Sequence, residues 1–313
     1  MKNIHNNKKI SVSVGIAAYN SERNIAHILT SLLKQKTDNY DFEKIVIHSD
    51  ASTDRTVDIV KKFDSQKIKI INNKNRKGFA GSVKKLLETI QSDIIVLLND
   101  DIEIRDVRLI SKLINPFLYE KNLGLVCGNP QPLPPTNFIE RAAVASSYTH
   151  DRMRKYIKNG NSKYSSDGKI MVLSRELVKK INFPTELNEM GNADTFIYLS
   201  CIDSGFKFRF LENAVVFCRM PQNIKDLSRW QIRNNSNRFI LRKRFKTLVD
   251  KEYAKPPLLF WTCMIPEVFK NPAGCIFIFF FSLYVIYQGK RYAKNFNPTW
   301  DLIETSKRIS KYD

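Results

Sequence analysis

Three groups of polar residues in the first third of the chain each follow a short apolar stretch. They are Tyr19-Asn20, Ser49-Asp50-Ala51-Ser52 and Asn99-Asp100-Asp101. The adjacent carboxylates of the third group are hard oxygen ligands, which suit Mg²⁺ or Mn²⁺ already shared with a diphosphate. Adjacent acids also cap ordinary turns, so the surrounding sequence must decide between a metal site and a turn.

The stretches around these groups alternate between two kinds of hydrophobic spacing. Strands are predicted at residues 10–18, 44–48, 68–71 and 94–98, and helices at 24–33, 56–63 and 82–90. This alternation predicts an α/β fold of βαβ units with right-handed crossovers, in which helices flank a mostly parallel sheet. Because ligands bind at the carboxyl ends of such strands, we expect the three polar groups to meet at one edge.

Beyond residue 104 the patterns are weaker. They indicate a helix at 109–119, a strand at 123–127, a Pro-rich loop at 129–135 and a polar segment at 158–167. We interpret these stretches as acceptor-side elements of the same domain.

Four motifs in the first third, in this order and spacing, resemble the family 2 glycosyltransferases, whose nucleotide-binding half has the GT-A fold. They are VSVGIAAYNSERNI, IVIHSDASTDRT, NRKGFAGSVKKLL and VLLNDDIEI. The resemblance implies a Rossmann-like GT-A domain over residues 9–250, with a nucleotide-binding half at 9–104 and an acceptor half at 105–250. It also implies a transferase that takes sugar from a nucleoside diphosphate sugar, most simply a UDP-sugar, with Mn²⁺ or Mg²⁺ as cofactor.

The resemblance assigns roles at the donor site. The residues that it implies for nucleotide-sugar binding are Ala18, Tyr19, Asp50, Lys77, Gly78, Asp100 and Gly168. Ala18 and Tyr19 would border the base, Asp50 would accept a hydrogen bond from it, and Asp100 would meet the ribose. Asp101 would hold the metal together with donor phosphates and water. The competing interpretations are a wedged core aromatic for Tyr19, a helix cap for Asp50 and Asp54, and a solvated loop charge for Lys77.

The second half carries two further motifs of this kind. SSDGKIMVLSREL resembles the segment beside the donor sugar, where Asp167 and Gly168 would line the pocket. EMGNADTFIYLSCIDSGFKFRF places Asp194 on the catalytic aspartate and Ala193 on the glutamate that precedes it. An inverting transferase needs one carboxylate to take the proton of the attacking hydroxyl, which is the role expected for Asp194. A helix N-cap is the alternative for Asp194, and Glu189 would replace the missing acid if its loop folds back.

The segment KDLSRWQIR resembles the Gln-x-x-Arg-Trp motif of polymerising members, with Asp226 in place of Gln. Arg229 would neutralise the diphosphate and Trp230 would form a floor under the acceptor. The alternative is an amphipathic basic helix that packs one Trp into the domain.

Charge and cysteine content limit the partners and the compartment. Lys and Arg number 51 against 31 Asp and Glu, a net charge of +20, which favours anionic partners. No nucleic-acid-binding signature accompanies this charge, so nucleic acid is not the expected partner. Five cysteines without CxxC spacing favour a reducing, cytosolic environment. Residues 1–8 form a basic tail without the apolar core of a signal peptide.

Residues 251–313 are expected to form a membrane-associated helical tail. The stretch 271–289 has no charged residue and, at about 1.5 Å per residue, is just long enough to cross a hydrocarbon core of about 30 Å. A single span would put basic segments on both sides, against the positive-inside rule. With the second apolar stretch at 257–269, we expect a re-entrant or interfacial hairpin on an anionic leaflet. A single span and a buried soluble helix are the alternatives.

The combined expectation is an inverting glycosyltransferase on the cytoplasmic face of a membrane. Its acceptor would be a glycan or a lipid-linked molecule in cell-surface polysaccharide or glycolipid synthesis. One rival is a lapsed enzyme that binds the nucleotide sugar without turnover, suggested by Ala193 and Asn99. The other is a nucleotidyltransferase, which would need a Gly-rich loop after the first strand, where this chain has Ala17-Ala18-Tyr19-Asn20.

Overall fold

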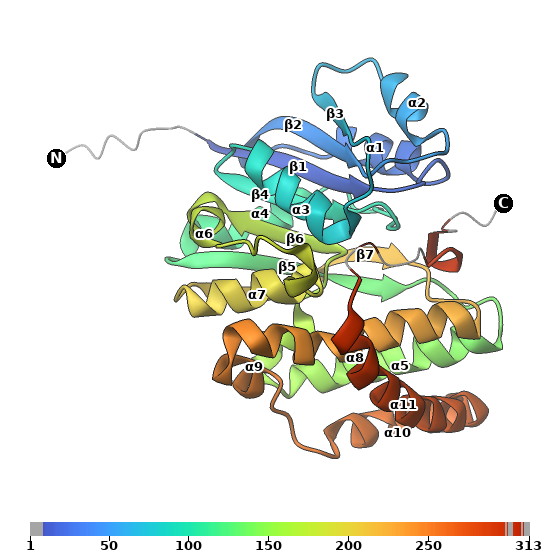
Figure 1. Cartoon of the computed structure of the whole chain (residues 1–313). Helices are drawn as coiled ribbons and strands as arrows, with labels where there is room; N and C mark the ends of the chain where they lie inside the picture. The colour runs from blue at the N-terminus through green and yellow to red at the C-terminus, as the bar shows by residue number, and fades with distance from the viewer. Residues whose placement is uncertain (1–8, 298, 300–302, 308, 310–313) are drawn as a thin grey trace.

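A computed structural model describes residues 9–297, 299, 303–307 and 309, and the expected basic tail at 1–8 lies outside these residues. Its centre is a seven-stranded sheet in the order β3-β2-β1-β4-β6-β5-β7. Helices cover both faces of the sheet, and a further group of helices lies below it in Figure 1. The α/β, GT-A-like fold class expected from the sequence is confirmed.

The first half follows the predicted alternation of strands and helices. Its elements are β1 (Ile10–Ala18), α1 (Ile25–Leu33), β2 (Tyr40–Ser49), α2 (Thr56–Lys61), β3 (Ile68–Asn72), α3 (Gly78–Thr89) and β4 (Ile94–Asn99). These four strands are mutually parallel. Helix α3 begins four residues before the predicted start at 82, because Asp50 accepts hydrogen bonds from the backbone N–H groups of Lys77 and Gly78 and so orders the first turn.

The second half completes the sheet with mixed pairing. Its elements are α4 (Leu109–Tyr119), β5 (Leu123–Pro132), α5 (Phe138–Lys155), β6 (Ile170–Ser174), α6 (Arg175–Lys180), α7 (Ala193–Asp203) and β7 (Lys207–Cys218). β6 runs antiparallel to both β4 and β5, whereas β5 and β7 are parallel. Residues 129–132, expected in a loop, belong to β5. β6 pairs only with Leu125–Cys127, so the prolines beyond have one free side, where a missing N–H is tolerated.

Alternating strand residues supply a core on each face of the sheet. Val12, Val14 and Ile16 of β1 face α1 and α4. On the other face, Leu97 of β4 and Leu173 of β6 pack with the buried residues of α3 and α7. The two cores together hold the carboxyl ends of the strands in one plane.

The remaining helices form an outer layer on α5. They are α8 (Ile224–Phe245), α9 (Thr247–Glu252), α10 (Leu259–Lys270) and α11 (Pro272–Tyr292). Helix α11 packs on α8 and α5, and its buried stripe is Gly274, Cys275, Ile278, Phe281, Val285 and Gly289. A Cβ at Gly289 would lie 3.1 Å from that of Asn235, so glycine allows α11 and α8 to approach closely.

The chain then returns from α11 to the sheet. The amide of Asn24 donates a 2.7 Å hydrogen bond to the carbonyl of Lys307, which fixes the short turn η5 (Thr305–Lys307) beside the end of β1 (Figure 1). This part of the expected tail therefore lies against the nucleotide-binding half.

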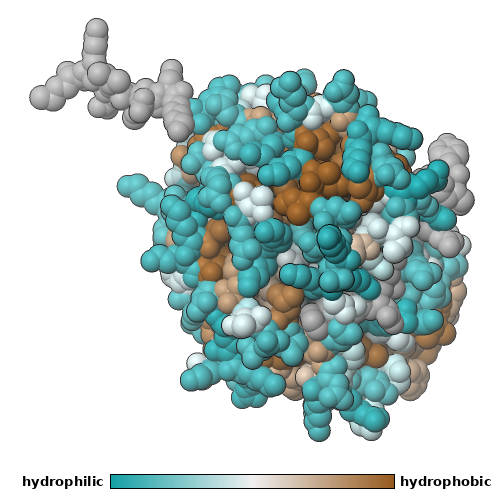
Figure 2. Space-filling model, turned by 45° about the horizontal axis from the view of Figure 1, so that its top comes forward, coloured by the Kyte–Doolittle hydropathy of each residue, from teal (hydrophilic) through white to brown (hydrophobic). Residues whose placement is uncertain are grey.

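Figure 2 shows that hydrophilic residues cover most of the face it presents, with hydrophobic residues in smaller areas.

Candidate active site

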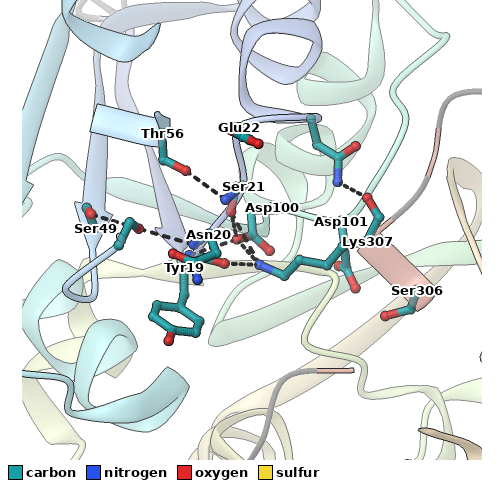
Figure 3. Close-up of polar contacts among 12 residues, drawn as sticks. Tyr19, Asn20, Ser21, Glu22, Ser49, Thr56, Asp100, Asp101, Ser306 and Lys307 are labelled. Atoms are coloured by element: carbon teal, nitrogen blue, oxygen red, sulfur yellow. Dashed lines mark hydrogen bonds and ion pairs between the residues drawn. The ribbon is translucent and has the colours of Figure 1, made fainter. Parts of the chain in front are cut away.

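The carboxyl ends of β1, β2 and β4 meet as the sequence predicts. The backbone N–H of Tyr19 donates to Asp100 Oδ2 at 2.9 Å, and the N–H of Asp50 donates to the carbonyl of Ala18 at 2.9 Å. Figure 3 shows the loop after β1 folded over Asp100. The three polar groups thus form one continuous site edge.

Asp100 is held by three donors that converge on a single oxygen. Besides the N–H of Tyr19, Asp100 Oδ2 accepts a very short hydrogen bond from the Ser21 hydroxyl. The same oxygen forms an ion pair with Lys307 Nζ at 2.6 Å. The same ammonium donates to the Tyr19 carbonyl and reaches the Ser21 hydroxyl at 3.3 Å (Figure 3). The second oxygen, Asp100 Oδ1, is left for a ligand.

Asp101 has one oxygen paired and one without a partner. Lys169 Nζ lies 2.8 Å from Asp101 Oδ2, whereas Oδ1 is buried and accepts no hydrogen bond from any described residue. Burial alone would raise the pKa of Asp101, but the charge and hydrogen bond of Lys169 together with the charge of Lys307 hold the pKa below its usual value. An ionised carboxylate with an unsatisfied buried oxygen fits a divalent cation. Over the described part of the chain, no three His, Cys, Asp or Glu side chains converge, so other ligands would come from phosphate and water.

Asp50 orders the loop that begins α3. Its two oxygens accept the N–H groups of Lys77 at 2.8 Å and Gly78 at 2.7 Å. Gly78 has φ of +77°, a left-handed conformation that favours glycine. The N-cap position of α2 is Arg55, one residue after the expected Asp54, whose carboxylate accepts the N–H of Thr56 in the first turn. Each carboxylate oxygen of Asp50 has capacity for another donor, so it could also accept a hydrogen bond from a nucleotide base. That contact stays a prediction.

The aromatic ring of Tyr19 is covered by a neighbouring cation. The guanidinium of Arg76 lies 3.9 Å from the ring centroid, a cation–π distance. The side chain of Lys77 is exposed, although its backbone N–H is fixed by Asp50. Arg76 is therefore the cation of this loop that stands at the site.

Asp194 lies in the first turn of α7, two residues after the N-cap position. The N-cap position is Asn192, so the N-cap interpretation of Asp194 is wrong. A Cβ on Gly168 would lie 3.6 Å from that of Asp194, and the Ser166 hydroxyl donates to the Asp194 carbonyl at 3.2 Å. Lys169, which follows Gly168, binds Asp101. One short segment thus joins Asp194 to the acid pair.

The surroundings of Asp194 make it a weaker acid than usual. Burial and the charge of Asp167 raise the pKa of Asp194 to about 6, against the opposing effects of the Thr195 N–H, Lys163 and Arg233. Ala193 is buried in the core beneath α7, whereas Glu189 is exposed and is not among the groups that shift this pKa. The acid next to Asp194 is therefore Asp167.

Helix α8 presents two arginines one turn apart on the same face, Arg229 and Arg233. Burial lowers the pKa of Arg233, and the negative charges of Asp194, Tyr292 and Asp101 oppose that shift, so its guanidinium interacts electrostatically with both aspartates. Trp230 turns away, half-buried among apolar residues of α5 and α11. These contacts match the alternative of a helix that packs one Trp into the domain. The role of Trp230 as a floor under the acceptor stays a prediction.

Asp226, one turn before these arginines, anchors the returning chain. Its Oδ2 accepts the backbone N–H of Thr305 at 3.0 Å and the Thr305 hydroxyl at 2.7 Å. The residue that replaces the expected Gln thus fixes the turn that carries Lys307.

Three residues of the site received no site role from the sequence: Lys169, Arg233 and Lys307. Lys169 follows Gly168 directly, so the same motif could have indicated it. Arg233 repeats Arg229 at helical spacing. Lys307 lies 207 residues from Asp100 with no local signal, and only the fold brings the two together.

Comparison with known sequences places these motifs in context. The family profile described as Glycosyl transferase family 2 matches residues 13–181, more than half of the chain. The UDP-Glc:alpha-D-GlcNAc-diphosphoundecaprenol beta-1,3-glucosyltransferase WfgD of Escherichia coli is 24% identical over 235 residues, which cover 71% of this chain and 84% of that protein. The enzyme WfaP of Escherichia coli, a glucosyltransferase with the same donor and acceptor in its name, is 27% identical over 200 residues, which cover 63% of this chain and 72% of that protein.

Solved structures share the fold at low identity. The mannosyltransferase PcManGT from Pyrobaculum calidifontis, in complex with GDP-Man and Mn²⁺, aligns with a TM-score of 0.59 and 15% identity over 95% of this chain and 77% of that one. Glucosyl-3-phosphoglycerate synthase from Mycobacterium tuberculosis, in complex with Mn²⁺, UDP and phosphoglyceric acid, gives a TM-score of 0.54 and 14% identity over 76% and 79%.

Removal of the Lys307 charge tests the returning segment. Lys307→Met leaves the partly buried Asp100 carboxylate without its counter-ion, so we expect a loss of about 1–3 kcal/mol in the free energy of unfolding by urea. Hydrogen exchange of the Tyr19–Ser21 loop should rise. Lys294→Met, at an exposed lysine of the same tail, is the matched control. Equal stability of the two variants would contradict a structural role for this ion pair.

Proposed function

Because the chain belongs to glycosyl transferase family 2, we propose that it is an inverting enzyme that moves a sugar from a UDP-sugar to a hydroxyl of a lipid-linked or glycan acceptor. The two Escherichia coli relatives are named for UDP-Glc and a diphosphoundecaprenol-linked acceptor, and the mycobacterial structure contains UDP. The observation that carries the proposal is the segment 167–169, which packs against Asp194 on one side and binds Asp101 on the other.

The acid pair is the proposed metal and ribose site. Asp101 would hold Mn²⁺ or Mg²⁺ through its unpaired Oδ1, and Asp100 Oδ1 would meet the ribose or the same ion. The bound ion would stabilise the charge that develops on the leaving diphosphate. Lys169 binds Asp101, and the charge of Asp101 also acts on Arg233, so both cations would pair with phosphate oxygens of the donor.

The base of the donor would lie at the edge bordered by Ala18 and Tyr19. The Tyr19 ring under Arg76 offers a planar surface for stacking. Asp50 and Gly78 hold the loop that forms the opposite wall. Gly168 would leave room for the donor sugar, because a Cβ there would lie 3.6 Å from that of Asp194 and 3.5 Å from Cε1 of Phe79.

Asp194 is the proposed general base. It takes the proton of the acceptor hydroxyl while that oxygen bonds to the anomeric carbon and the bond from carbon to the diphosphate oxygen breaks. With a pKa of about 6, it is ionised near neutral pH and a stronger base than an ordinary aspartate. Asp167 supplies the neighbouring negative charge in place of a glutamate at Ala193.

The helices α10 and α11 are the proposed membrane attachment. Within the described residues, α11 and its extension, Pro272–Asn295, form one helix long and apolar enough to cross a membrane. One side of α11 packs on the protein, and the large apolar side chains exposed on the two helices include Phe269, Ile276, Phe280, Leu283 and Tyr287. A helix fixed along the domain with its other side apolar favours an interfacial position over a single span. Lys270, Lys290 and Arg291 at the helix ends would face anionic head groups of the cytoplasmic leaflet.

The pH dependence of turnover tests Asp194. Since the base acts only when ionised and its pKa is about 6, kcat should be level above about pH 7 and fall about tenfold per unit well below pH 6. Asp194→Asn should lower kcat by about 10²–10⁴-fold while UDP binding stays within about twofold. Release of UDP from a panel of UDP-sugars, with membrane lipid extract and Mn²⁺, measures the first, and calorimetry measures the second.

Asp203→Asn, at an exposed acid of the same helix, is the control for charge loss. If Asp194→Asn behaves like the parent in turnover, Asp194 is not the base. Donor binding without turnover in the parent itself would favour the lapsed-enzyme interpretation.

Vesicle flotation tests the membrane proposal. Phe280→Asp with Leu283→Asp should cut binding to vesicles of phosphatidylcholine and phosphatidylglycerol by about tenfold or more, because each charge would enter the apolar boundary. Tyr119→Asp, at an exposed aromatic of α4, is the matched control. Unchanged flotation of the double variant would rule out this face as the attachment surface.

A further inference from the structure

Two lysines and two tyrosines form a cluster on the acceptor side of Asp194. Lys163 Nζ lies 3.8 Å from the ring centroid of Tyr253 and 4.8 Å from that of Tyr164. Lys255 Nζ lies 5.5 Å from the centroid of the same Tyr164 ring. The Tyr164 hydroxyl donates to the Tyr253 carbonyl at 2.7 Å, which fixes the two rings relative to each other. The cluster is thus an ordered pair of ammonium groups.

The cluster has more positive than negative charge. Neither Lys163 nor Lys255 forms an ion pair with a carboxylate among the described residues. Burial lowers the pKa of both, that of Lys163 to about 8, so Lys163 remains mostly charged at neutral pH. A partly buried cation such as Lys163, without a carboxylate partner, is costly unless a ligand supplies the negative charge.

The cluster lies next to the proposed base. Lys163 and Ser165 bound a short turn, and the following Ser166 donates to the Asp194 carbonyl. The charge of Asp194 acts on both Lys163 and Tyr253. An acceptor whose hydroxyl is at Asp194 would therefore place its next group at these lysines.

An aromatic path leads from the cluster to α10 and α11. Lys255 Nζ lies 5.6 Å from the Phe260 ring, whose centroid is 5.2 Å from that of Trp261. Trp261 is in turn 5.2 Å from Phe279 of α11. Trp261 and Phe279 line an apolar groove of about 240 Å³ between the two helices, together with Met264, Val268 and Ile276. The groove opens among the exposed apolar side chains of the proposed membrane face.

We propose that this path is a binding site for a lipid phosphate or diphosphate, with the phosphate oxygens between Lys163 and Lys255 and the hydrocarbon chain along Phe260 and Trp261 in the groove. The order of charged and apolar groups along the path matches such a molecule. Its sugar hydroxyl would lie at Asp194, its phosphate at the two lysines, and its hydrocarbon chain against α10 and α11. The inference rests on the proposed function, since it assigns the acceptor of that reaction to the class of anionic lipid-linked sugars.

Farnesyl diphosphate is a probe that needs no turnover. Calorimetry on the full chain, with UDP present to fill the donor site, should show binding that is at least about tenfold tighter than that of inorganic diphosphate or farnesol. Lys163→Met and Lys255→Met should each raise the Kd by about tenfold, and Trp261→Ala should weaken farnesyl diphosphate but not inorganic diphosphate. Lys180→Met, at an exposed lysine of α6, is the control.

Because Lys255 is exposed, its variant should fold even if Lys163→Met does not. Binding that neither lysine substitution weakens would overturn the inference. If no UDP-sugar is turned over but the affinity for farnesyl diphosphate still depends on both lysines, the inference holds and the proposed function fails. Normal turnover without that dependence overturns the inference alone.

Discussion

Partly buried negative charge at the carboxyl ends of the parallel strands is the constraint on which this structure depends. Asp100 and Asp101 are both buried, and isolated ionised carboxylates at such a place would be costly. Each is paired with a lysine from elsewhere in the chain, Lys307 for Asp100 and Lys169 for Asp101. These two ion pairs tie the returning carboxyl-terminal segment and the acceptor half to the nucleotide-binding edge.

The two ion pairs leave part of each carboxylate able to bind a ligand. Three donors converge on one oxygen of Asp100, and Lys169 takes one oxygen of Asp101, so one oxygen of each acid remains for a ligand. The ammonium groups hold the carboxylates in place before any ligand arrives, which lowers the reorganisation needed on binding. Lys169, which binds Asp101, and Arg233, on which the charge of Asp101 acts, would stand beside the diphosphate of the proposed donor.

The acceptor side is built differently, from aromatic rings and cations on a layer of helices outside the sheet. Helices α8 and α11 pack on α5, and the segment between α9 and α10 carries Tyr253 and Lys255 from the vicinity of Asp194 toward the apolar face. The proposed donor site and the proposed membrane face can therefore coexist in one domain. The turn that holds Lys163, close to the proposed base, would connect the two.

The sequence by itself determined the elements of the first half and the carboxylates at the strand ends, because hydrophobic period and turn chemistry are local properties. It also indicated Asp194 as a candidate through its motif, although α7 begins at Ala193, two residues before the predicted start at Thr195. Only the tertiary structure decided which cations balance these acids, that Asp167 neighbours Asp194, and that residues 129–132 extend a strand. Those facts depend on contacts between residues far apart in the chain, such as Lys307 and Asp100, whose pairing is set by how the helices pack and where the chain end returns.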